Sequence, residues 1–306
     1  MIRAIVSGAA SPAGAELIRI LLHHPDVEIT GAVHPRLAQM PLADTVAGLT
    51  GDTDMRLSGT YGSADGDVLF LADNEVPDFD IDADDCASLR IIDMTGRLEG
   101  HTGFVTGIGE LNRKPMVRGA RRAAIPDALT VLAVTALLPL AKNRLLESDS
   151  IRAVAEGAGP EHASTASGRT TRILASAQPG FTGKVTVTAE PSGDGEVRDL
   201  GGRVRFNRIT VTIPCNVGLR HVTELYDEYF DDHNFVFTID GRIPAPADVV
   251  NTNKLLINLT TAPDGTLTVT AACDPVIKGS AGAAVHCMNL LFGLHERTGL
   301  NLLPLG

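Results

Sequence analysis

The chain opens on residues 2–33, IRAIVSGAASPAGAELIRILLHHPDVEITGAV, and this segment sets its fold class. Residues 3–7 read as a short apolar strand that runs directly into a glycine-bounded turn. Apolar residues then recur at helical spacing over 16–23, Pro25 ends that helix, and 27–33 read as a second strand. A strand, a helix and a second strand of this length are typical of a right-handed βαβ unit whose strands pair in parallel.

Two more apolar runs, at 67–72 and 89–93, predict further buried parallel strands in the first region. Later in the chain the pattern changes, because segments such as 184–190 and 266–273 alternate and are enriched in Thr and Val. The expected fold class is therefore α/β. It combines a Rossmann-type doubly wound parallel sheet with a second α+β domain that contains a mixed or antiparallel sheet.

Length and charge restrict the classes of function. A chain of 306 residues has room for about two domains. Its formal net charge of −11, from 26 basic and 37 acidic side chains, disfavours nucleic acid and anionic membrane surfaces as partners. No secretory leader is expected, and the apolar run at 129–140 is too short to span a bilayer. We expect a small-molecule substrate and neither nucleic acid nor a membrane as partner.

The four cysteines, Cys86, Cys215, Cys273 and Cys287, show neither CxxC spacing nor a His/Cys ligand pattern. Scattered thiols of this kind fit a reduced compartment better than a disulfide framework or a zinc site. The sequence therefore predicts a cytoplasmic protein without a metal centre.

The turn between the first strand and its helix, GAASPAG, is the strongest candidate binding element. Gly8 allows a tight turn, Gly14 allows close packing of the helix on the sheet, and Ser11 stands where a middle glycine often occurs. Through Pro12 and Ala13 the loop leads into a helix N-terminus that can bind a pyrophosphate. The spacing alone also occurs in turns that bind nothing, but the strand–turn–helix context favours a dinucleotide site.

The end of the second strand, AVHPR, holds the residues expected to meet the ribose of a dinucleotide. An Asp or Glu there would favour NAD, whereas His34 and Arg36 can bind a 2′-phosphate and favour NADP. The alternative is that Arg36 is only a surface residue on a loop.

Several motifs occur in the same order as in a known enzyme family. Residues 8–29 resemble the opening of N-acetyl-γ-glutamyl-phosphate reductases, in which a GxxGxxGxEL turn leads a helix that ends in HPxVE. Residues 276–294, VIKGSAGAAVHCMNLLFGL, resemble that family's LVKGAAGxAVQNMNLMxGL element. The other matches are IIDMTG at 91–96, GIGELNR at 107–113, and TNK at 252–254, which resembles the family's SNR element. The resemblance spans nearly the whole chain.

This resemblance implies an NADP-binding domain at 1–125, a catalytic and dimerisation domain at 126–277, and a C-terminal helix at 278–306 that returns to the first domain. It also implies NADPH-dependent reduction of an acyl phosphate to a semialdehyde in arginine biosynthesis. In the family, a cysteine thiolate displaces phosphate to form a thioester, NADPH reduces it, and a histidine carries protons. We expect a homodimer or homotetramer, or else a hetero-oligomer with an active paralogue.

Both members of the family's catalytic pair are missing here. The family's nucleophile lies in a GCYPTA segment before a helix that ends in LLPL, and the matching residues 123–128 read AAIPDA, which places Ala124 at the nucleophile position. The family's histidine precedes a TPH motif, whereas this chain has no histidine between His162 and His221. Cys215 stands in the IPC that matches TPH, and it is either a substitute nucleophile or a buried apolar residue.

Two further groups of residues are retained from the family. The group that the resemblance assigns to the substrate pocket is Glu110, Asn112 and Arg113. The group that reads as a phosphate-binding loop before a helix N-terminus, and that we assign to the cofactor, is Lys278, Gly279 and Gly282. The alternative for the first group is a solvated helix start.

Two functions remain open at this point. The chain can be an NADPH-dependent reductase of this family, and hydride transfer to a ready-made aldehyde, imine or ketone needs no nucleophile. It can also be a catalytically inactive homologue that acts as a nucleotide-binding partner or regulator, because a fold alone does not fix a function.

Overall fold

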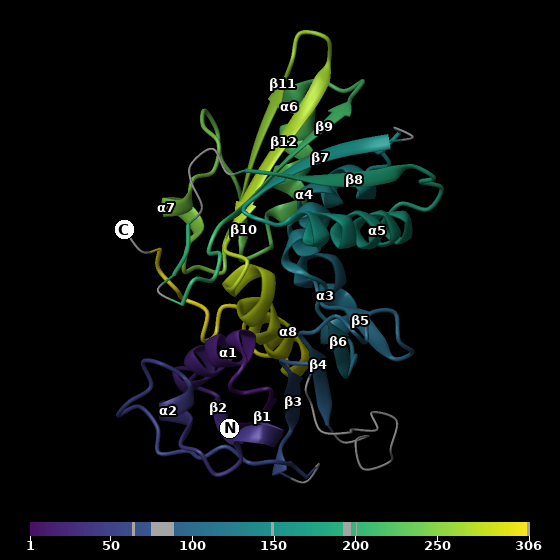
Figure 1. Ribbon diagram of the computed structural model, residues 1–306. Coiled ribbons are helices and arrows are strands. Elements are labelled where there is room, and N and C mark those ends of the chain that lie inside the picture. The colour runs from purple at the N-terminus through teal and green to yellow at the C-terminus, as the bar shows by residue number, and fades with distance from the viewer. Residues whose placement is uncertain (63–64, 75–88, 148–149, 192–196, 200, 305–306) are drawn as a thin grey trace. The chain divides into compact units, whose positions relative to one another are not determined.

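The computed structural model describes residues 1–62, 65–74, 89–147, 150–191, 197–199 and 201–304, so Cys86 lies outside the described residues. They form two units (Figure 1). Unit 1 consists of Met1–Pro126 and Ser280–Asn301, and unit 2 consists of Asp127–Gly279 and Leu302–Gly306. Each unit is built around its own six-stranded sheet.

The sheet of unit 1 has the order β2-β1-β3-β4-β6-β5, and every pairing between these strands is parallel. The strands are β1 (Ile2–Ser7), β2 (Val27–Val33), β3 (Val68–Leu71), β4 (Arg90–Asp93), β5 (Phe104–Thr106) and β6 (Arg122–Ala124). The predicted Rossmann-type parallel sheet is confirmed. β5 and β6 were not predicted, because strands of three residues are too short to show a periodic pattern.

One face of this sheet carries helices, and Figure 1 shows α1 and α8 beside each other there. The helices of unit 1 are α1 (Pro12–Leu22), the 3-10 helix η1 (Pro35–Leu37), α2 (Leu42–Thr45), α3 (Gly109–Val117) and α8 (Gly282–Phe292). The other face buries alternate strand residues such as Ile5, Leu69 and Ile91, against which Leu98 and Phe104 pack. Strands buried on both faces explain the continuous aliphatic runs of the sequence.

A buried polar network fixes α8 within unit 1. Burial lowers the pKa of His24, so its imidazole is neutral. Its Nδ1 accepts the N–H of Asp26 at 3.2 Å, and its Nε2 therefore donates to Oδ1 of Asn289 at 3.1 Å. The amide nitrogen of Asn289 donates to the carbonyls of Glu296 at 3.0 Å and Thr298 at 2.8 Å. One amide thus connects α8 to the end of α1 and to the segment after α8.

The sheet of unit 2 has the order β10-β11-β12-β9-β7-β8. The strands are β7 (Ser150–Glu156), β8 (Lys184–Glu190), β9 (Asn207–Pro214), β10 (Val236–Thr238), β11 (Leu255–Thr261) and β12 (Thr266–Cys273). β7 pairs with β8 and β10 with β11 in parallel, and the other pairings are antiparallel. The expected second domain with a mixed sheet is therefore confirmed.

Helices cover one face of this second sheet (Figure 1). They are α4 (Ala128–Lys142), α5 (Pro160–Ala177) and α6 (Leu219–Phe230), while α7 (Pro246–Val249) and a π-helix (Ile277–Ala281) lie in connections. The Tyr226 hydroxyl of α6 donates to the carbonyl of Ala136 in α4 at 2.6 Å, and burial raises the pKa of Tyr226. The opposite face exposes Arg152, Thr186 and Thr212. Within the described residues, no helix combines the length and apolar character that crossing a membrane requires.

We expect Asn289→Ala to lower the free energy of unfolding by about 2–4 kcal/mol, because it leaves the buried His24 ring and two carbonyls unpartnered. Urea denaturation measures the change. The control is Asn143→Ala, whose amide donates to the Pro139 carbonyl near the exposed end of α4 and should cost less than about 1 kcal/mol. Equal losses in the two variants would contradict the role given to the network.

Candidate functional site

The candidate cofactor site lies at the carboxyl ends of β1 and β3, where the strand order reverses. Gly8 follows β1 with a φ of +86°, a conformation that residues with side chains rarely adopt. A Cβ atom on Gly8 would lie 2.5 Å from Cβ of Asp73, just beyond β3. A Cβ atom on Gly14 would lie 2.1 Å from the carbonyl oxygen of Gly8. Both positions therefore require glycine for the close contacts that the sequence predicted.

Ser11 stabilises this turn because its hydroxyl both donates and accepts a hydrogen bond. The hydroxyl oxygen accepts the N–H of Gly14 at 3.0 Å, and the hydroxyl donates to the carbonyl of Ala72 at 3.1 Å. Pro12 has no N–H, whereas the N–H of Ala13 belongs to a first turn that lacks helical acceptors. No acidic residue stands in that turn, so the positive end of the helix dipole remains available to an anion.

The ribose-binding residues predicted from the sequence follow β2. His34 precedes the 3-10 helix Pro35–Leu37, and Arg36 within it is exposed. Two buried polar atoms at this edge of the sheet, Oγ of Ser7 and Nδ1 of His34, have no hydrogen-bond partner among the described residues. Because nearly all buried polar atoms in proteins are paired, such atoms indicate places where a ligand can supply the partner.

Ala124 lies inside the sheet of unit 1. It is the last residue of β6, pairs with Asp93 and Thr106 of the neighbouring strands, and is 1% exposed. A catalytic thiol is activated at a helix N-terminus, and the next helix, α4, begins only at Ala128. Residues 123–130 contain no cysteine. The nucleophile position therefore lacks a thiol whether it is aligned with Ala124 or with Ala128.

The N-terminus of α4 is capped by the carboxylate of Asp127. Its Oδ1 accepts the N–H of Thr130 at 3.0 Å, and its Oδ2 accepts the Thr130 hydroxyl at 2.7 Å and Nη1 of Arg169 at 3.1 Å. The chain's own carboxylate thus occupies a position where a helix N-terminus would stabilise a bound anion. Gly279 packs against the next residue, since a Cβ on it would lie 2.4 Å from Cβ of Ala128.

Cys215 is remote from the N-terminus of α4. It follows the end of β9 that pairs with the start of β12. The far end of β12, at Cys273, leads to Gly279 and so to the contact with Ala128. Eight residues of β12 separate the two ends, a length of about 25 Å. Cys215 is partly buried against the hydrophobic core, which favours the apolar interpretation over the substitute nucleophile.

The segment of Lys278 and Gly279 is helical where the sequence suggested a loop, and its assignment to the cofactor stays a prediction. A π-helix at Ile277–Ala281 continues directly into α8 at Gly282, and Ala281 already has helical backbone angles. The first N–H groups of α8 therefore follow a helical turn that can supply acceptors. Lys278 is 1% exposed, and its ammonium lies 5.5 Å from the centre of the Phe235 ring.

The three residues assigned to the substrate pocket lie together on α3: Glu110, Asn112 and Arg113. Glu110 is buried, and the amide of Asn112 donates to the carbonyl of Thr106 at 2.8 Å. Arg113 forms an ion pair with Glu296 at 2.8 Å, and the same carboxylate lies 2.7 Å from Nε2 of His286 on α8. Within unit 1, these side chains join α3 to the C-terminal part of the unit.

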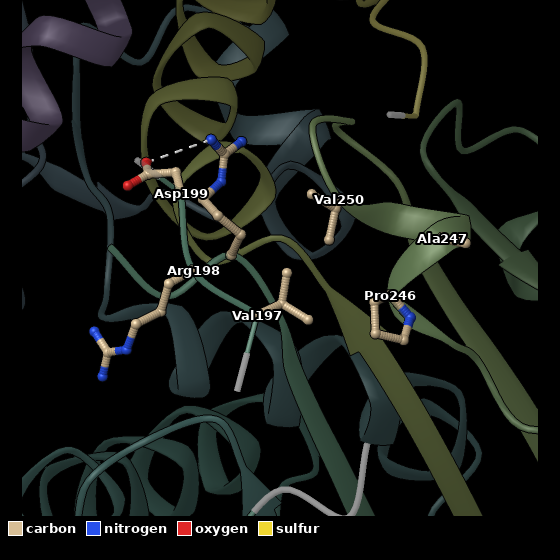
Figure 2. Close-up of a pocket in the computed structure, with 7 residues that line it drawn as sticks. Val197, Arg198, Asp199, Pro246, Ala247 and Val250 are labelled. Carbon is tan, nitrogen blue, oxygen red and sulfur yellow. Dashed lines mark ion pairs between the residues drawn. The ribbon is translucent and has the colours of Figure 1, made fainter. Parts of the chain in front are cut away.

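Unit 2 also contains a largely apolar hollow of about 330 Å³ (Figure 2). It is lined by Val197, Arg198, Asp199, Arg205, Pro246, Ala247 and Val250. Figure 2 shows Val197 and Val250 pointing toward one another, while the guanidinium of Arg198 points away. Arg205 donates to Asp274 at 2.6 and 2.9 Å and lies 3.7 Å from Asp199. Because this cation is already neutralised, the hollow is a poor site for an anion.

Sequence reasoning missed three residues that the structure brings forward. Asp73 follows a predicted strand at the same sheet edge as Gly8, and the rule that parallel strands end together could have found it. Ser7 carries no signal in the sequence. Asn253 stands in the TNK match at 252–254, but only its burial without partners among the described residues gives it a role. Among the described His, Cys, Asp and Glu side chains, no group of three gathers as a metal site would require.

Comparison with known proteins decides the family. No family model matches the sequence. N-acetyl-γ-glutamyl-phosphate reductase from Parabacteroides distasonis is 34% identical over 99% of both chains, and the same enzyme from Bacteroides thetaiotaomicron is 33% identical over 99% of both. The chain belongs to the N-acetyl-γ-glutamyl-phosphate reductase family. The resemblance read from its motifs is confirmed.

Solved structures agree with this family member in fold. Aspartate semialdehyde dehydrogenase II from Vibrio cholerae, complexed with ASA, has a TM-score of 0.71 at 11% identity and covers 96% of this chain and 98% of its own. Aspartate semialdehyde dehydrogenase with NADP from Candida albicans has a TM-score of 0.67 at 14% identity, with 95% and 98% covered. At such identities the likeness shows the fold alone, and it confirms the expected α/β class.

In this member of the N-acetyl-γ-glutamyl-phosphate reductase family, we expect Gly8→Ala to lower the free energy of unfolding by about 2–4 kcal/mol. The methyl group would combine a positive φ with a collision against Asp73. Gly51→Ala is the control, because Gly51 has a φ of +89° and nothing within 4 Å, so strain alone should cost about 1 kcal/mol. Urea denaturation compares the two, and equal losses would contradict the close contact at Gly8.

Proposed function

We propose that this chain is an NADPH-dependent reductase that acts on a ready-made carbonyl group of an N-acylated amino-acid derivative. One observation carries the proposal: the tight turn at Gly8 and Gly14 is intact, while residues 123–130 contain no thiol. The relatives' name, N-acetyl-γ-glutamyl-phosphate reductase, supplies the substrate class. A thioester cannot form on an alanine methyl group, so the acyl phosphate route of the family is not open to this chain.

The residues at the carboxyl ends of β1 and β2 fit NADP. The compact turn brings the N-terminus of α1 to this edge, where its first N–H groups can hold a pyrophosphate. His34 and the exposed Arg36 follow β2, where a ribose 2′-phosphate would be recognised, and residues 33–37 contain no carboxylate to repel it. The unpartnered atoms of Ser7 and His34 give a bound dinucleotide polar groups to contact. NADPH held there would supply hydride.

Reduction of an existing carbonyl group needs less from the protein than the family reaction does. One hydride adds to the carbonyl carbon and one proton to the oxygen, so neither a covalent intermediate nor a phosphate leaving group is involved. The chain's task is then to bind and orient the substrate and to exclude water. The carboxylate of Asp127 already accepts the N–H of Thr130 at the N-terminus of α4, so that N–H is not available to an acyl phosphate.

A second candidate is a nucleotide-binding partner or regulator without turnover. The missing thiol favours it as much as it favours a changed substrate. Buried polar groups without partners weigh against it, because a chain released from catalysis gains stability by losing them. Binding of the nucleotide without reduction of any carbonyl substrate would decide for this candidate.

We also propose a cytoplasmic setting and assembly through unit 2. Among the described residues, Cys215, Cys273 and Cys287 are free thiols, as expected in a reducing compartment. The open sheet face, with Arg152 and Thr212 exposed, offers a surface for a second copy in a homodimer or homotetramer. The same face would serve a hetero-oligomer with a cysteine-bearing paralogue.

The cofactor proposal predicts tight NADPH binding and weak NADH binding, measured by titration of nicotinamide fluorescence. Arg36→Glu should weaken NADPH binding about 10- to 100-fold and leave NADH binding nearly unchanged, because only NADPH carries the 2′-phosphate. Arg118→Glu, at an exposed arginine that follows α3 in the same unit, is the control and should change neither affinity. Equal affinities of the wild type for the two nucleotides would contradict the assignment of NADP.

The reaction proposal predicts NADPH-dependent reduction of N-acetylglutamate semialdehyde to the alcohol, followed by absorbance of NADPH. The phosphate-dependent oxidation of the same aldehyde with NADP should be absent, since no thiol can form the thioester. Cys215→Ser should leave the aldehyde reduction unchanged, because Cys215 follows the end of β9 that is remote from the N-terminus of α4. Phosphate-dependent oxidation by the wild type would contradict the proposal.

A further inference from the structure

Asn253 is buried with an unsatisfied amide. Its side chain lies in the connection between α7 and β11 and is 2% exposed. Neither Oδ1 nor Nδ2 has a hydrogen-bond partner among the residues that the structure describes. Among the side chains that the structure describes, it is the only one in which an acceptor atom and a donor atom are both left in this state.

The backbone around Asn253 is held on both sides. The N–H of Asn251 donates to Oδ2 of Asp274 at 2.8 Å. The Thr252 hydroxyl donates to the carbonyl of Val249 at 2.8 Å and accepts the N–H of Lys254 at 3.1 Å. The amide of Asn253 is thus carried by a fixed loop, and the loop cannot move far to bring it to water.

The same framework extends to the N-terminus of α4. Asp274, which binds the loop through Asn251, accepts the N–H of Gly279 on its backbone carbonyl at 3.1 Å, and Gly279 packs against Ala128. On the other side, the carbonyl of Phe235 accepts the first N–H of β11 at 2.8 Å, and its ring faces the ammonium of Lys278. The loop of Asn253 is therefore fastened to the segment that contacts the start of α4.

We propose that Asn253 is a ligand-binding residue that pairs with a group presenting an N–H donor beside a carbonyl acceptor. This inference rests on the proposed function, because the N-acylated amino acids named there carry an amide N–H next to a carboxylate. The carboxamide oxygen accepts the N–H, and the carboxamide nitrogen donates to the neighbouring oxygen. A phosphate offers acceptors only and would leave Oδ1 unpartnered, so the pairing selects the amino-acid end of the substrate.

The nicotinamide carboxamide presents the same chemistry, so binding experiments must separate the two sources. The probes are N-acetyl-L-glutamate and NADPH, each titrated alone onto the full chain by calorimetry. Asn253→Leu removes both hydrogen-bonding groups at similar volume, and Asn253→Asp keeps an acceptor and removes the donor. We expect both variants to bind N-acetyl-L-glutamate at least about 10-fold more weakly and NADPH as the wild type does.

Thermal unfolding without ligand tests whether the amide is structural. Because Asn253→Leu removes two unsatisfied buried groups, we expect its Tm to rise by about 2–4 °C. The matched control is Asn258→Leu on the adjoining strand β11, where the amide donates to the carbonyl of Ile239 at 2.9 Å. That variant should lower the Tm and leave both affinities unchanged.

Three results would overturn the inference. They are a fall in the Tm of Asn253→Leu, a loss of NADPH binding in place of N-acetyl-L-glutamate binding, and no saturable binding of N-acetyl-L-glutamate by the wild type. A wrong cofactor assignment would give a different result. The wild type would then not bind NADPH, while the titrations with N-acetyl-L-glutamate would still test Asn253.

Discussion

The contact between the start of α1 and the turn after β1 is the constraint on which the candidate site depends. A Cβ on Gly14 would lie 2.1 Å from the carbonyl oxygen of Gly8, so the helix can lie this close to the strand only with glycine at position 14. Ser11 then fastens the turn to the end of β3 through Ala72. The helix N-terminus, the end of β2 and the end of β3 consequently meet at one edge of the sheet, which is where an α/β sheet binds its ligand.

Buried polar groups in this protein fall into two kinds, and the contrast gives the unpartnered ones their meaning. The amide of Asn289 satisfies His24 and two carbonyls with its oxygen and nitrogen, so α8 is fixed at little energetic cost. The amide of Asn253 is equally buried and has no hydrogen-bond partner in the described part of the chain. This contrast between two buried amides supports the proposal that a ligand pairs with the second.

The sequence predicted the parts of the fold that have a local pattern. The βαβ opening, the strands at β3 and β4 and the Thr-rich strands of unit 2 all show periodicity or apolar runs of sufficient length. β5 and β6 do not, because each has three residues and owes its position to the strands beside it. The helix at Lys278 was not predicted, because Gly279 and Gly282 suggest a loop. The structure shows a tertiary reason for Gly279, which packs closely against Ala128.

The sequence predicted those residues of the candidate site that the backbone conformation requires. It did not predict those that are distinguished only by burial. Gly8 and Gly14 are visible in the sequence because only glycine suits their geometry. The sequence assigns no role to Ser7, Asp73 and Asn253. Their roles follow from tertiary contacts, or from hydrogen-bond partners that are absent among the described residues. Cys215 shows the opposite error, since a thiol beside a strand end attracts attention, while strand pairing places it about 25 Å along the sheet from the segment that contacts the N-terminus of α4.

The proposal of a changed reaction rests on more than the absence of a cysteine from residues 123–130. A helix N-terminus has a limited number of free N–H groups and stabilises an anion only within its first turn. At α4 the carboxylate of Asp127 takes the N–H and hydroxyl of Thr130, and Arg169 balances its charge. A thiolate placed at Ala128 would meet this carboxylate instead of an open helix end. This capped helix end is therefore consistent with the proposed reaction, which needs no anionic nucleophile.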